Sequence, residues 1–169
     1  HLAERIPPHL PALNADEQQA MALVDRAGLL ARRGAPGFEA RAVELLEQAV
    51  RQAPAFALAR TRLAGTLYNR ALRLVGPERR SQFQRAREEV DAAVKLDPMD
   101  PRARAMWLVY RYRHELNFWQ TRDALLDLAE RFPESPVPLN ALGIVYTDVG
   151  HAAEAEACQR QAHRLEPLN

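Results

Sequence analysis

The chain has 169 residues, of which 47% are hydrophobic and 27% are charged, and its 23 basic and 22 acidic side chains leave a formal net charge of +1. A single domain of this size can bury a core without metals or disulfides, and the charge balance excludes intrinsic disorder and nucleic-acid binding through bulk charge. No apolar run reaches the roughly 18 residues of a transmembrane helix, so we expect a soluble protein. The sequence does not determine its compartment, and it favours the cytoplasm only slightly over the periplasm.

Two residue types are nearly absent. Cys158 is the only cysteine, so the chain forms no internal disulfide and the compartment is not decided by cysteine usage. Lys95 is the only lysine, so arginine supplies nearly all of the positive charge. Codon bias is the first explanation for this, and a role of the forked guanidinium in binding carboxylates stays open.

Residues 1–13 are predicted to be an extended lead-in, because prolines recur in this segment. A helix is predicted to begin at Asn14, since Glu17 three positions later completes a capping box. Apolar residues then follow at helical spacing as far as the glycine- and proline-rich stretch 34–37, namely Met21, Val24, Leu29 and Leu30. No later stretch alternates like a strand, so we predict an all-α protein.

The rest of the chain repeats itself. Four segments end on a proline, at Pro54, Pro98, Pro133 and Pro167. In three of these segments alanine stands at the same two positions before the proline. These alanines are Ala42 and Ala49, Ala86 and Ala93, and Ala155 and Ala162. A small residue lets two helices approach closely and a proline ends a helix, so each segment predicts a pair of packed helices.

The first helix of each predicted pair has its own pattern. A leucine is followed directly by a small or branched residue, and an apolar or aromatic residue follows at one further spacing. This pattern recurs in Leu63–Leu67, Leu108–Tyr112 and Leu142–Tyr146, and Gly150 follows the last of them as a turn. With these residues the chain resembles the tetratricopeptide repeat (TPR) family, whose unit is about 34 residues long. The resemblance implies a right-handed α-solenoid of antiparallel helix pairs in a single domain, 14–169, with units at about 14–56, 57–100, 101–135 and 136–169.

The sequence departs from the family pattern in three places. An insertion around residues 74–80 predicts a longer helix or a wider loop in the second unit. Thr121 and Leu128 stand where alanine is usual, which predicts looser packing in the third unit. The polar helix that usually closes such arrays at the C-terminus is missing, which predicts an uncapped end.

The family resemblance also implies that the first helices line a concave groove. Carrying the family positions over places ten residues in it: Arg32, Tyr68, Asn69, Met106, Tyr110, Arg113, His114, Asn140, Ile144 and Asp148. Such a surface suits an extended peptide or a partner helix, with tyrosine and arginine as anchors. The alternative is that Met106 and Tyr110 only pack against the neighbouring unit. The carboxylate-binding residues of chaperone-recruiting TPR domains are absent, because their positions hold Gly28, Gly65, Tyr110 and Ile144, so that ligand is not expected.

Other chemistries are not indicated. Interleaved arginines and aromatic residues at 106–119 could stack nucleotide bases, but helical spacing assigns most of them to packing, so no nucleic-acid partner is expected. His151, Cys158 and His163 do not share one helix face, as a zinc site would require. No phosphate-binding glycine loop or catalytic triad pattern occurs, so we expect no metal, no cofactor and no enzymatic activity.

These observations predict a scaffold for protein–protein recognition. A looser resemblance, carried by residues 29–33, 42–54 and 117–119, is to the C-terminal TPR region of bacterial winged-helix or cyclase-type regulators. It implies a sensory or partner-binding role in signal transduction, with the output elsewhere in a larger protein. Two alternatives stay open, namely a homo-oligomerisation module that uses the uncapped end and a small-ligand-sensing domain.

Overall fold

The computed structural model describes residues 13–33, 37–115 and 117–166, without the side chains of Arg33, His114 and Glu115. All regular structure in these ranges is helical, which confirms the predicted all-α class. The elements are α1 (Ala15–Arg33), α2 (Phe38–Gln52), α3 (Ala57–Ala71), α4 (Gly76–Leu96), α5 (Pro101–Glu115), α6 (Phe118–Arg131), α7 (Val137–Asp148) and α8 (Ala152–Leu165). Apart from Leu13, the predicted lead-in lies outside the described residues.

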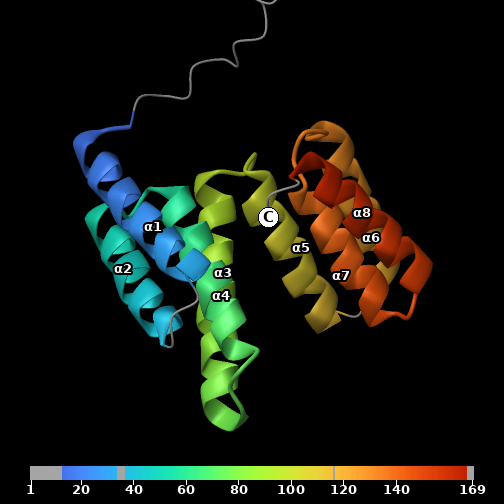
Figure 1. Cartoon of the computed structure of the whole chain (residues 1–169), viewed down its shortest axis with the longest axis horizontal. Coiled ribbons are helices and arrows are strands. Elements are labelled where there is room, and N and C mark those ends of the chain that lie inside the picture. The colour runs from blue at the N-terminus through green and yellow to red at the C-terminus, as the bar shows by residue number, and fades with distance from the viewer. Residues whose placement is uncertain (1–12, 34–36, 116, 167–169) are drawn as a thin grey trace, which may run out of the picture.

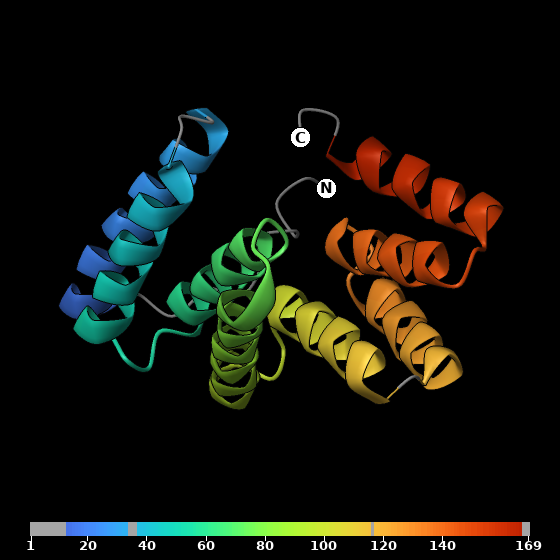
Figure 2. The ribbon, with the colours of Figure 1, turned by 90° about the horizontal axis from the view of Figure 1, so that it is seen from below.

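Consecutive helices pack as hairpins, and the hairpins follow one another along an arc (Figure 1, Figure 2). Each odd-numbered helix contacts the next, from α1 through α3 and α5 to α7. Among the described residues, the even-numbered helices do not contact one another. The odd-numbered helices therefore form the inner row of the arc, and the even-numbered helices lie outside it.

The capping box at the start of α1 is present. The backbone N–H of Glu17 donates to Asn14 Oδ1 at 2.9 Å, and the backbone N–H of Asn14 donates to Glu17 Oε2 at 2.9 Å. These two bonds satisfy donors that have no partner within the helix, and they set where α1 begins.

The small residues at fixed offsets lie where helices touch. Ala42 and Ala49 in α2, and their counterparts Ala86, Ala93, Ala155 and Ala162 in α4 and α8, are all buried. In α6 the larger Thr121 and Leu128 are buried at the same offsets, and α6 packs less extensively on α5 than the second helix of any other pair packs on its partner. The packing in this pair is less extensive, which agrees with the looser packing predicted from the bulkier side chains.

The insertion in the second unit lengthens a helix. At 21 residues α4 is longer than α2, α6 and α8, and its N-terminal end projects beyond its neighbours (Figure 1). Gly76 adopts a positive φ of 63° at the start of α4, which the missing Cβ makes accessible. Val75 just before it is 82% exposed, so this end of α4 contributes little to the core.

The core has two parts. One cluster joins α1 to α4 and includes Tyr110 from α5. The other joins α5 to α8 and includes Ala105, Val109 and Tyr112 from α5. Helix α5 therefore uses two faces to connect the halves. In the described part of the chain, no helix is both long and apolar enough to cross a membrane.

Candidate binding groove

The inner row of helices carries an apolar cavity of about 250 Å³ between α3, α5 and α7. Six of the residues predicted for the groove line it, namely Tyr68, Asn69, Met106, Tyr110, Asn140 and Ile144. The rest of the wall consists of small and aliphatic residues: Gly65, Ala105, Val109, Val137 and Ala141. These residues lie close together because equivalent positions of successive hairpins face the same side of the stack.

Arg113 connects the three helices that enclose this cavity. Its Nη1 donates a hydrogen bond to the Tyr68 hydroxyl, and its Nη2 lies 3.3 Å from Asp148 Oδ2. The guanidinium carbon is also 5.6 Å from the centre of the Tyr68 ring, within the range of a cation–π contact. Arg113 and Asp148 thus lie at the groove without lining the cavity, and each compensates the other's charge.

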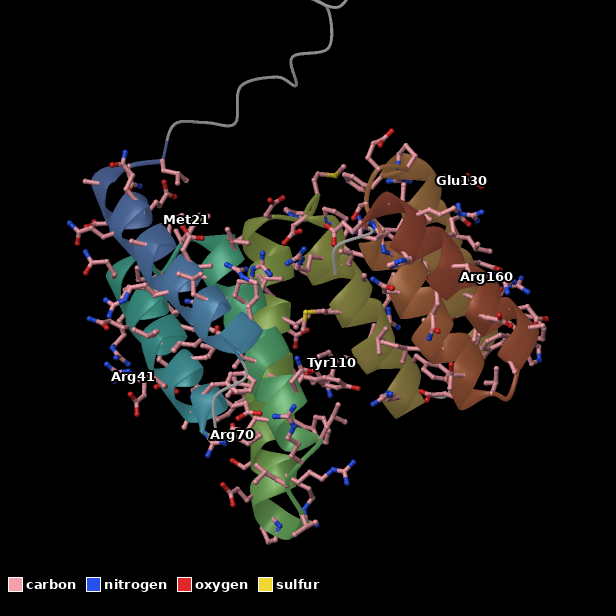
Figure 3. All side chains as sticks on the ribbon, in the orientation of Figure 1. Met21, Arg41, Arg70, Tyr110, Glu130 and Arg160 are labelled. Carbon is pink, nitrogen blue, oxygen red and sulfur yellow. The ribbon has the colours of Figure 1, made fainter. Side chains whose placement is uncertain are left out.

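Tyr110 on α5 belongs to the first core cluster and lies beside α4 (Figure 3). It is only 6% exposed, and its ring packs edge-on against Tyr68 with the ring centres 5.5 Å apart. Its hydroxyl is buried and has no hydrogen-bond partner among the described residues. Burial raises the pKa of Tyr110, and it raises the pKa of Tyr68 as well. Tyr110 therefore both packs against the neighbouring hairpin and forms part of the cavity wall.

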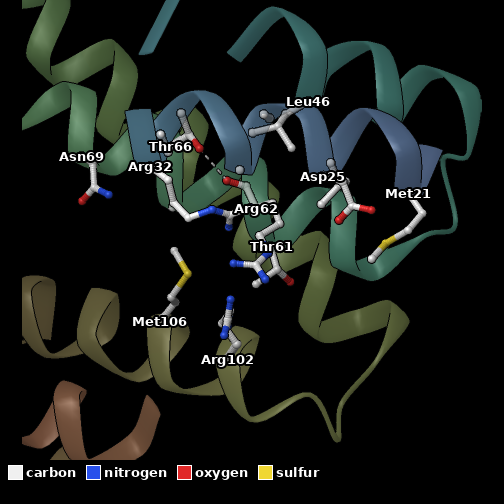
Figure 4. A pocket seen from close by; sticks show the side chains of 15 residues that line it. Met21, Asp25, Arg32, Leu46, Thr61, Arg62, Thr66, Asn69, Arg102 and Met106 are labelled. Atoms are coloured by element: carbon white, nitrogen blue, oxygen red, sulfur yellow. Dashed lines mark hydrogen bonds between the residues drawn. The ribbon is translucent and has the colours of Figure 1, made fainter. Parts of the chain in front are cut away.

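A second pocket of about 350 Å³ lies next to the first, toward α1. Predicted Arg32 lines it, together with Arg62 from α3 and Arg102 from α5, and the three side chains project toward the same space (Figure 4). The two pockets have three wall residues in common: Gly65, Asn69 and Met106. They therefore form one continuous groove along the inner row of helices.

Sequence reasoning missed Arg62 and Arg102, because arginine is abundant in this chain and no local pattern distinguishes these two. The unusual preference for arginine over lysine was the only signal that pointed toward them. The side chain of His114, also predicted for the groove, lies outside the described part of the structure. No group of three or more metal-binding side chains is found in the residues that are described.

The chain resembles known proteins in its fold. No protein-family model matches the sequence, and no curated protein matches it significantly. Among solved structures, TTC0263, a thermophilic TPR protein in Thermus thermophilus, superposes with a TM-score of 0.67 at 18% identity, covering 90% of this chain and 76% of that protein. The chain has the TPR fold. MamA (residues 41 to the end) from Desulfovibrio magneticus RS-1 superposes with a TM-score of 0.54 at 17% identity, covering 92% of this chain and 78% of the other.

Proposed function

We propose that this chain is a non-catalytic protein-interaction domain that binds an extended peptide or a partner helix along the inner row of its TPR fold. The supporting observation is the continuous groove, in which an apolar cavity with exposed Ile144 and Asn140 at its wall adjoins a pocket rich in arginine. Apolar side chains next to directional polar groups are what peptide-binding grooves use for affinity and specificity.

The test uses a matched pair of variants. Ile144 lines the cavity and is 40% exposed, whereas Leu126 on α6 is 41% exposed and lies outside both pockets. Ile144→Arg should block the cavity, and Leu126→Arg adds the same charge on the outer row of helices. Random peptides displayed on phage are selected on the unmodified domain and their affinities for all three proteins are measured.

We expect the selected peptides to bind the unmodified domain and Leu126→Arg alike and to bind Ile144→Arg at least ten-fold more weakly. Peptides that bind all three proteins equally would contradict a groove site. A failure to select any peptide, together with a metabolite that raises the melting temperature, would favour the small-ligand-sensing alternative, since a ligand that binds only the native state stabilises it.

The oligomerisation alternative has less support. Among the described residues α8 exposes no large hydrophobic side chain, and its outer surface carries the ion pair Arg160–Glu156. Such a polar surface favours contact with solvent over a self-association interface. The role in a larger bacterial regulator and the four unit boundaries given above stay predictions, as do the absence of a nucleic-acid partner and of catalysis.

A further inference from the structure

Three guanidinium groups meet in the pocket next to α1 without a direct anionic partner. Arg32, Arg62 and Arg102 come from three successive inner helices (Figure 4). Among the described residues, none of the three side chains makes a salt bridge or a side-chain hydrogen bond, whereas many other arginines of the chain do, such as Arg60, Arg85 and Arg113. Arg102 and Arg32 both repel the Arg62 guanidinium electrostatically, so the cluster costs free energy in the unbound protein.

Carboxylates near the cluster compensate it only in part. Asp25 is the only acidic residue among the described residues that line the pocket. Asp100 does not line the pocket. Its Oδ1 accepts a hydrogen bond from the Arg102 backbone N–H at 2.9 Å, and its Oδ2 lies 3.3 Å from the Thr61 hydroxyl, which is also 3.0 Å from the Ala57 carbonyl oxygen. The pKa of Arg62 is lowered, first by burial and then by repulsion from Arg102, while Asp100 and Asp25 act in the opposite direction. The three cations therefore have two carboxylates near them, Asp25 in the pocket wall and Asp100 outside it, so positive charge exceeds negative charge.

The chemistry of the neighbouring cavity limits what else the ligand carries. Both pockets are lined by Gly65, Asn69 and Met106. A bound peptide that places an anionic group at the arginines therefore has its neighbouring side chains at the apolar cavity. A Cβ built on Gly65 would meet only the Met106 methyl group, at 3.9 Å, so the groove floor is open at this junction. A peptide backbone can approach closely where the floor has no side chain.

The arginine cluster also lies in the middle of its pocket. Asn69 lies on one side of the three arginines, and Met21 and Asp25 lie on the other (Figure 4). A bound chain can therefore continue past the cluster in both directions, which suits an acidic side chain within a segment better than a chain terminus. The planar fork of the guanidinium matches the two oxygens of such a carboxylate.

We propose that the groove recognises an internal protein segment that carries an aspartate or glutamate close to a large apolar residue. The carboxylate binds Arg32, Arg62 and Arg102, and the apolar side chain enters the cavity between α3, α5 and α7. This proposal rests on the proposed function, because it names the partner chemistry of the same groove.

The test uses the peptides selected above and the double variant Arg32→Gln/Arg62→Gln. The control is Arg41→Gln/Arg160→Gln, which removes the same charge from outer helices at opposite ends of the array (Figure 3). The affinity of each selected peptide is measured in three versions, in which the acidic residue is kept, replaced by asparagine or glutamine, or replaced by phosphoserine. Each peptide is also measured with a free and with an amidated C-terminus.

We expect the selected peptides to contain an internal acidic residue next to an apolar one. The double variant should bind them at least ten-fold more weakly than the control does, because charge-assisted hydrogen bonds are lost. Replacement of the acidic residue by its amide should have the same effect, and amidation of the C-terminus should have none. The double variant should melt at or above the temperature of the unmodified domain, since it removes repulsion and no salt bridge.

Four results would overturn the inference. Selected peptides without acidic residues that bind the double variant normally but lose affinity for Ile144→Arg would leave the proposed function standing and remove this inference. Binding that requires a free C-terminus or a phosphoserine would assign the cluster to a different anion. A large drop in the melting temperature of the double variant would make the cluster structural, and peptides indifferent to Ile144→Arg and to the double variant would contradict both proposals.

Discussion

Gly143 is buried on α7 where this helix faces α8, and its surroundings predict opposite effects for two substitutions. A Cβ at this position would lie 3.5 Å from Gln159 Cγ, 3.6 Å from the Ala155 carbonyl oxygen and 3.9 Å from Cys158 Cβ. These are ordinary van der Waals distances, so alanine fits. Because alanine also loses less backbone entropy in a helix, Gly143→Ala should stabilise the domain by roughly 0.5–1 kcal/mol.

A leucine at the same position has no room beyond its Cβ. Its additional carbons would be directed at the α8 backbone near Ala155, and overpacking of this kind typically costs about 1–3 kcal/mol. In a domain of this size about 1 kcal/mol shifts the melting temperature by about 2–4 °C. Gly143→Ala should therefore raise it by about 1–4 °C, and Gly143→Leu should lower it by about 2–12 °C.

Thermal unfolding followed by circular dichroism measures both shifts, and hydrogen exchange of α8 locates the damage. The α8 amides should exchange faster in Gly143→Leu, while α1 and α2 should be unaffected, since they belong to the other core cluster. If the leucine variant melts at or above the alanine variant, the close approach of α7 and α8 is refuted, and with it the packing role of the small residue in this repeat.

The remaining predictions also concern stability. Tyr110→Phe should stabilise the domain by about 1 kcal/mol, because it removes a buried hydroxyl without a described partner, whereas Tyr68→Phe should destabilise it by removing the hydrogen bond from Arg113. Because burial raises the pKa of Tyr110, this phenol ionises first in the unfolded state, so the free energy of unfolding is unaffected by it below about pH 10 and falls as the pH rises above that value. Urea unfolding between about pH 8 and 11 should show a decline that Tyr110→Phe reduces, and an unchanged decline would contradict this. Asn14→Ala should cost about 1 kcal/mol and increase exchange of the first amides of α1, and unaltered exchange there would argue against the capping box.

Only some of the residues that line the groove could be predicted from the sequence. Positions such as Met106 and Asn140 follow from repeat register, because equivalent residues of successive hairpins must face the same way. The pairing of Arg113 with Asp148 does not follow from it, because the two lie on different helices and only the packing distance between α5 and α7 brings them within 3.3 Å. For the same reason Arg62 and Arg102 become neighbours of Arg32 only after the hairpins stack.

The amino-acid sequence by itself determined the class of fold, the start of α1 at Asn14 and the buried alanines where helices meet. These properties depend on local capping and on short repeat offsets, which are visible in a linear chain. Only the tertiary structure decided that the insertion lengthens α4, that the Tyr110 hydroxyl is buried without a described partner, and that three arginines from separate hairpins share one pocket with a neighbouring apolar cavity. The burial of the Tyr110 hydroxyl and the arginine pocket both depend on how helices of different hairpins pack together, which has no counterpart in any single segment.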